Sequence, residues 1–124
     1  MLIKSHHIKG IGRGKEIGFP TLNLFVPEDI LLDDGIYSSW VIIDGASYKG
    51  ALHFGSVPTF NQKEKSMEVH LIDITDDNFP DTNDKIIEID VVDKLRDIKR
   101  FIESEDLTEQ IVQDVAKIKS MLKS

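Results

Sequence analysis

The sequence contains no cysteine, and this absence excludes disulfide bonds, thiolate zinc sites and cysteine nucleophiles. Long apolar runs are also missing, so no segment is expected to span a membrane. The first ten residues, MLIKSHHIKG, lack the apolar stretch of a secretory signal. Basic residues are comparatively few, 15 Lys and Arg against 22 Asp and Glu, and the formal charge of −7 argues against a general nucleic-acid binder. Together these absences fit a cytoplasmic protein.

The length and the composition predict one globular domain. The chain has 124 residues, enough for a single core but too few for a nucleotide-binding domain joined to a separate catalytic domain. Residues 1–20 carry four basic side chains against Glu16 alone, a local balance of +3 within an acidic chain. This basic island suits a phosphorylated small molecule better than a polynucleotide, although a chance distribution explains the charge equally well. The four basic residues are Lys4, Lys9, Arg13 and Lys15.

Most of the first two thirds has the pattern of β-strands. Residues 36–43 and 46–54 flank Asp44-Gly45, a strong hairpin signal, so they are predicted to form an antiparallel hairpin. Residues 66–74 alternate with period two, and further strands are expected at 85–92 and, more weakly, at 2–9 and about 20–25. In the alternating strand, Met67, Val69 and Leu71 share one face, and Glu68, His70 and Ile72 share the other.

The C-terminal segment predicts an amphipathic helix over about 104–122. Its apolar residues recur at steps of four, four, three and four, from Leu107 to Leu122, and Ser104 is suited to cap its start. One helix cannot cover both faces of six strands. We therefore expect an all-β fold, a closed six-stranded antiparallel β-barrel over about 1–95 with this helix packed outside.

The segment 10–18 concentrates glycine and positive charge. Glycines let backbone N–H groups approach an anion closely, so the segment is interpreted as a flap that cradles phosphates. It is neither a Walker A loop nor a dinucleotide fingerprint, because the spacing and the following elements differ. A flexible loop between two strands is the alternative. The residues concerned are Gly10, Gly12, Arg13, Gly14, Lys15 and Gly18.

A polar pair follows this flap. Pro20 stiffens the chain, and Thr21 and Asn23 are two residues apart, so on an extended strand their side chains share a face. A hydroxyl and an amide offer oxygen ligands for Mg²⁺ and hydrogen bonds for a phosphate. The alternative is a pair of polar residues that satisfy a turn at a strand end.

Several motifs in their order along the chain resemble the riboflavin kinase (flavokinase) family. The resemblance runs from about residue 8 to 118. It rests on GIGRGKEIGFPTLN at 10–23, GIY at 35–37, GSVPTF at 55–60, MEVHL at 67–71, and Leu95, Arg96, Phe101, Leu107, Gln110, Ile111 and Asp114.

The resemblance implies transfer of the γ-phosphate of ATP to the ribityl 5′-hydroxyl of riboflavin, with Mg²⁺ or another divalent metal. It implies that Thr21 and Asn23 contact the metal and the nucleotide, that Glu68 is the catalytic base, and that Arg96 and Phe101 contact the flavin. The phosphate-binding set it implies is Gly10, Gly12, Arg13, Gly14, Lys15, Gly18, Pro20, Thr21 and Asn23.

We expect a monomer that binds riboflavin and ATP but neither nucleic acid nor membrane. Because the chain begins almost at the flap strand, we also expect it to lack the adenylyltransferase domain of many bacterial relatives. Of the histidines, His70 is interpreted as structural or as a hydrogen-bond partner rather than as a second base, and His6 and His7 as a solvated strand start. A flavin- or nucleotide-binding barrel without turnover is the alternative, and a barrel that binds oligonucleotides is disfavoured by the charge.

Overall fold

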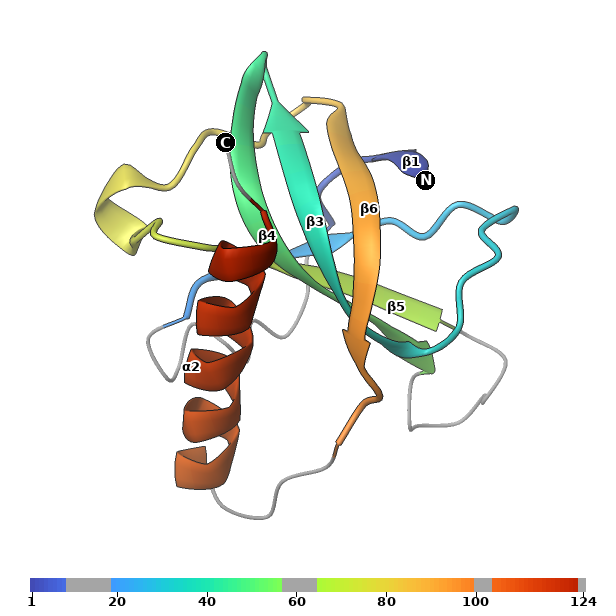
Figure 1. Cartoon of the computed structure of the whole chain (residues 1–124). Helices are drawn as coiled ribbons and strands as arrows, with labels where there is room; N and C mark the ends of the chain where they lie inside the picture. The colour runs from blue at the N-terminus through green and yellow to red at the C-terminus, as the bar shows by residue number, and fades with distance from the viewer. Residues whose placement is uncertain (9–18, 57–64, 100–103, 123–124) are drawn as a thin grey trace.

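The computed structural model describes residues 1–8, 19–56, 65–99 and 104–122, and shows an antiparallel sheet with one long helix on its outer face (Figure 1). The six predicted strands and the predicted helix are all present. The elements are β1 (Leu2–Ser5), β2 (Thr21–Leu24), β3 (Gly35–Ile43), β4 (Ala46–Ser56), β5 (Lys65–Leu71), η1 (Asp76–Asn78), β6 (Ile87–Arg96) and α2 (Ser104–Met121).

The strands are hydrogen-bonded in the order β1-β6-β3-β4-β5-β2. The predicted hairpin is confirmed, with Ile43 paired to Ala46 across the turn. Asp44 and Gly45 have positive φ angles of 52° and 82°, as a two-residue hairpin turn requires. The strand predicted to reach residue 74 ends instead at Leu71, because the chain turns at Asp73, which has a φ of 65°.

The sheet is open, so the prediction of a closed barrel is wrong. In the part of the chain that the structure describes, β1 and β2 are the two edges, and the only strand pairing between them is an isolated bridge from His7, just beyond β1, to Leu24 of β2. Each edge strand has only four residues, which leaves little length for pairing. Two backbone hydrogen bonds, Ile8 N to Asn23 O (2.8 Å) and Phe25 N to His6 O (3.0 Å), flank the bridge. The architecture is a half-barrel.

The two faces of the sheet are covered differently. The inner face carries the main core, in which Val41, Leu52 and Val69 are fully buried. The outer face is covered in part by α2, whose Ile118 packs with Ile72 and with Leu122, the residue after the helix, against the sheet. The predicted position of the helix outside the sheet is thus confirmed. Within the described residues, no helix has the length and apolarity needed to cross a bilayer.

Candidate active site

Strand pairing brings three predicted site residues together on the outer face. Asn23 of β2 lies directly opposite Glu68 of β5, and Thr21 lies opposite His70. Residues paired in this way project to the same side of a sheet, with Cβ atoms about 4.5–5.5 Å apart. Because Leu22 and Leu24 face the core, the intervening polar residues face outward. The sequence had placed Thr21 and Asn23 on one face, and the register adds Glu68 to it.

The Thr21 hydroxyl is a buried polar group on this face. Its Oγ1 is buried, and it makes no hydrogen bond to any described residue. A buried polar atom without a partner is costly, by about 1–3 kcal/mol, and such atoms call for an explanation. Asn23, half-buried one position further along the same face, supplies a second uncharged oxygen. The pair therefore suits a hard cation or a phosphate.

The donor set also fits the way in which Mg²⁺ binds nucleotides. Among the described residues, no group of three or more His, Asp or Glu side chains could hold a metal ion by themselves. Mg²⁺ commonly takes only one or two ligands from the protein and completes its octahedron with water and substrate phosphates. Thr21 and Asn23 are consistent with such a site, although carboxylates are the commoner protein ligands.

The start of β2 is held in place by His70. Its Nδ1 lies 2.8 Å from the carbonyl oxygen of Pro20, and because a carbonyl only accepts, Nδ1 carries the proton. The Phe19 ring meets His70 edge-on, with centroids 5.4 Å apart. Burial lowers the pKa of His70 below its usual 6.5, outweighing the Pro20 carbonyl and Asp73, which raise it. His70 is thus a hydrogen-bond partner, as the sequence predicted, and it fixes the residue before Thr21.

On the other side of Glu68 lies a residue that the sequence reasoning missed. His53 of β4 is paired directly with Glu68 and is half-buried. Burial lowers the pKa of His53 below its usual 6.5, while the Glu68 carboxylate raises it. The alternation of residues 46–54 was a usable signal, since Leu52 and Phe54 face the core and leave His53 on the outer face.

Arg96, predicted to contact the flavin, is held between the sheet and α2. Its Nη2 lies 2.8 Å from Asp114 Oδ2 and its Nε 3.0 Å from Asp114 Oδ1, while Nη1 donates to the carbonyl of Asp97. Gln110 Nε2 also donates to Asp114 Oδ1, at 2.9 Å. Arg96 therefore has a structural task here, and its contact with a flavin stays a prediction. The flap residues 10–18 and Phe101 lie outside the described residues.

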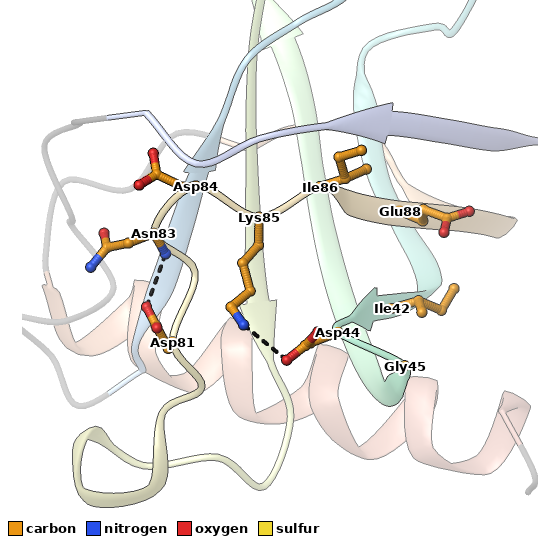
Figure 2. A pocket seen from close by; sticks show the side chains of 9 residues that line it. All are labelled: Ile42, Asp44, Gly45, Asp81, Asn83, Asp84, Lys85, Ile86 and Glu88. Atoms are coloured by element: carbon orange, nitrogen blue, oxygen red, sulfur yellow. Dashed lines mark hydrogen bonds and ion pairs between the residues drawn. The ribbon is translucent and has the colours of Figure 1, made fainter.

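A groove lies at another part of the sheet. It has a volume of about 700 Å³ and is lined by residues of the β3–β4 turn and of the segment that leads into β6. Figure 2 shows Lys85 pointing to Asp44, with Nζ 2.8 Å from Oδ2, while the carboxylates of Asp84 and Glu88 do not converge on them. The turn is seven residues along β4 from His53, or about 23 Å at 3.3 Å per residue. We place the candidate site at Glu68 and not in this groove.

Comparison with known proteins shows the family of this chain. The family model for riboflavin kinase (flavokinase) matches residues 1–122. The chain belongs to the riboflavin kinase family. Mouse riboflavin kinase is 31% identical over 123 residues, which cover 93% of this chain and 76% of the mouse protein. The bifunctional riboflavin kinase/FMN adenylyltransferase of Bacillus subtilis is 32% identical over 116 residues, covering 90% of this chain and 35% of that protein.

Other matches are to longer proteins. The trifunctional protein RibF/MnmA of Mycoplasmoides gallisepticum is 30% identical over 113 residues, 90% of this chain but 17% of that protein. The chain thus spans well under half the length of these bacterial relatives. A crystal structure titled as a macrolide-efflux protein from Streptococcus pneumoniae superposes with a TM-score of 0.83 at 24% identity, covering 98% of this chain and 39% of that one. At that identity the likeness supports the fold alone.

Proposed function

We propose that this chain is a riboflavin kinase, which transfers the γ-phosphate of ATP to the ribityl 5′-hydroxyl of riboflavin and yields FMN and ADP. The observation that carries the proposal is the register that sets Asn23 opposite Glu68, beside the unpartnered Thr21 hydroxyl, in a chain of this family. This register supports a site in which oxygen ligands for a nucleotide-bound cation lie next to a proton acceptor. Phosphoryl transfer requires this combination of charge neutralisation and positioning.

In the proposed reaction, the 5′-hydroxyl oxygen forms a bond to the γ-phosphorus while the bond between that phosphorus and the β–γ bridging oxygen breaks. The Glu68 carboxylate accepts the hydroxyl proton, and ADP leaves. Thr21 and Asn23 would hold Mg²⁺, which supplies positive charge to the phosphates. The hydrogen bond from His70 of β5 to the Pro20 carbonyl holds the start of β2 against β5, so that the Thr21 hydroxyl stays in position for its ligand.

The glycines and basic residues of the flap are proposed to cover the ATP phosphates. Arg96 and Phe101 are proposed to lie on the flavin side. For Arg96, the ion pair to Asp114 supports a role in holding α2 against the sheet, and any contact with the flavin ring would be made from that position. We propose that the protein acts on its two small-molecule substrates as a monomer.

The decisive assay incubates the purified chain with riboflavin, ATP and Mg²⁺ and separates FMN by chromatography. Glu68→Gln should lower kcat by at least about 10²-fold, since a positioned base typically contributes about 10²–10⁴-fold. The affinities for riboflavin and Mg·ATP should change little, because the amide keeps the shape of the carboxylate.

Glu88→Gln is the matched control, since Glu88 also faces outward but lies at the remote groove. It should leave turnover unchanged. A folded Glu68→Gln variant with near-wild-type kcat would refute the role as base. Binding of flavin and nucleotide without any FMN would favour the alternative, a binding domain without turnover.

A further inference from the structure

Five side chains lie in one row across the outer face of the half-barrel, each paired to the next through the strand register. Neighbouring strands are about 4.8 Å apart, so each member of this outer row is the direct lateral neighbour of the next. The row begins at the candidate metal ligand and ends under α2. In order, it consists of Asn23, Glu68, His53, Ile36 and Arg96.

His53 therefore flanks Glu68 on the side opposite Asn23. A reacting hydroxyl has to lie at Glu68, and the cation and phosphates belong on the Asn23 side. The remainder of the acceptor substrate must then leave Glu68 in another direction. A side chain on the His53 flank limits where the carboxylate can rotate as the acceptor enters.

The surroundings of His53 restrict its own movement. His53 is half-buried, and Ile36, the residue of β3 paired with it, is 7% exposed. A Cβ atom at Gly55 would overlap Ile98 Cδ1 and would lie 3.6 Å from His53 Cε1. Because position 55 is glycine, the Ile98 side chain has room to lie against β4 next to His53. His53 thus lies between Glu68 and Ile36 in a half-buried position on the outer face.

Burial, rather than the surrounding charges, favours an uncharged His53 ring. Burial lowers its pKa below 6.5 and is the largest influence, and Arg96 of β6 lowers it further. Glu68 of β5, and more weakly the His53 carbonyl and Asp34 before β3, raise it. A neutral imidazole offers one donor and one acceptor without cancelling the charge of the adjacent carboxylate. That is what a residue beside a general base requires.

We propose that His53 is a positioning residue for the phosphoryl transfer, which flanks the Glu68 carboxylate opposite Asn23 and keeps it directed at the acceptor hydroxyl. This inference rests on the proposed function, because it assigns a neighbour to the proposed base. Acidification protonates His53 and so places a positive charge beside Glu68. The imidazolium attracts the carboxylate and weakens it as a proton acceptor. Turnover then falls on the acid side with the titration of His53.

The kinetic test compares His53→Leu, which removes both nitrogen atoms, with His53→Asn, which retains a donor and an acceptor. His53→Leu should lower kcat by about 10- to 100-fold, the size expected when a reacting group is displaced by about 1 Å. Its KM for Mg·ATP should change little. His53→Asn should keep most of the activity, and in both variants the acid limb of the kcat–pH profile should move to lower pH. His6→Asn, at an exposed histidine outside the outer row, is the control.

The binding test needs no turnover. The His53 ring is titrated by NMR in the wild type and in Glu68→Gln. Loss of the carboxylate should lower the pKa of His53, because that carboxylate raises it. An unchanged pKa would show that the two groups are not coupled, and it would overturn the proposal even if His53→Leu failed to fold.

The two levels of inference can be told apart. A wild-type chain that makes no FMN refutes the proposed function. An active wild type with a fully active His53→Leu variant and an unmoved acid limb refutes the role of His53 alone.

Discussion

Replacement of Asp114 by alanine should destabilise the protein strongly, because it removes the group that ties α2 to β6. The Arg96 and Asp114 side chains are only 16% and 8% exposed, and the carboxylate accepts hydrogen bonds from Nε and Nη2 of Arg96. Gln110 donates a further bond to it. Removal of one member leaves the guanidinium buried and unpaired, and such truncations cost about 3–5 kcal/mol.

This free energy converts to a large change in melting temperature. With about 2.1 cal/mol/K of unfolding entropy per residue, a chain of this length has roughly 0.26 kcal/mol/K, so Asp114→Ala should lower Tm by roughly 12–19 °C. Thermal and urea unfolding followed by circular dichroism measure the effect. The double variant Arg96→Met with Asp114→Leu should recover most of the loss, since apolar replacement of a whole buried ion pair is often neutral.

The matched control breaks an exposed ion pair on the same helix. Lys119 Nζ lies 2.6 Å from Asp73 Oδ1, but the side chains are 43% and 69% exposed. Such a pair contributes about 0–1 kcal/mol, so Lys119→Ala should hardly change Tm. Equal decreases in Tm for Asp114→Ala and Lys119→Ala would refute the reasoning. They would mean that the ion pair of Arg96 does not stabilise the fold.

Three further outcomes are expected. Thr21→Val should leave Tm unchanged or slightly higher, because Oγ1 has no hydrogen-bond partner among the described residues. It should impair use of Mg·ATP far more than riboflavin binding, and Asn23→Ala should do the same more mildly. The opposite pattern would contradict this division of the site. Gly50→Ala should lower the free energy of unfolding by about 1–3 kcal/mol, because its Cβ would lie 2.7–2.8 Å from two core valines; an unchanged urea midpoint would contradict it. Burial lowers the pKa values of His53 and His70 below 6.5, so on acidification the unfolded chain takes up protons before the folded chain does. The free energy of unfolding should therefore be highest above about pH 7 and should decline as the pH falls toward about 5. A double His53→Gln, His70→Gln variant should show a weaker decline in calorimetry.

The sequence predicted those parts of the fold that depend on neighbours along the chain. Asp44-Gly45 specifies its hairpin through two positive φ angles, and the apolar spacing of 107–122 specifies a helix with one buried stripe. The opening between β1 and β2 could not be predicted in this way. It depends on how much of two short edge strands finds a partner across the sheet, which no local pattern encodes.

The candidate site likewise combines features that the sequence predicts with features that only strand pairing decides. Alternation places Glu68 opposite the core face of β5, but periodicity gives the face and not the partner strand. Pairing of β5 with β2 on one side and β4 on the other decides that Asn23 and His53 are its neighbours. For the same reason Arg96 could be assigned to a flavin by resemblance, while its ion pair to Asp114, 18 residues away, remained hidden.

The two faces of the sheet divide stability and chemistry between alternate residues of the same strands. Met67 and Val69 are buried in the main core, and Glu68 between them faces outward at the site. On the outer face, α2 covers Trp40, Ala51 and Leu95, so the helix stabilises that part of the sheet while the Asn23–Glu68–His53 end of the outer row is reached from β2, an edge strand. Because β2 is an edge, its outward polar groups can take ligands from outside the sheet without any interruption of the core. The open half-barrel thus leaves the candidate site at the edge of the sheet, on the face opposite its core.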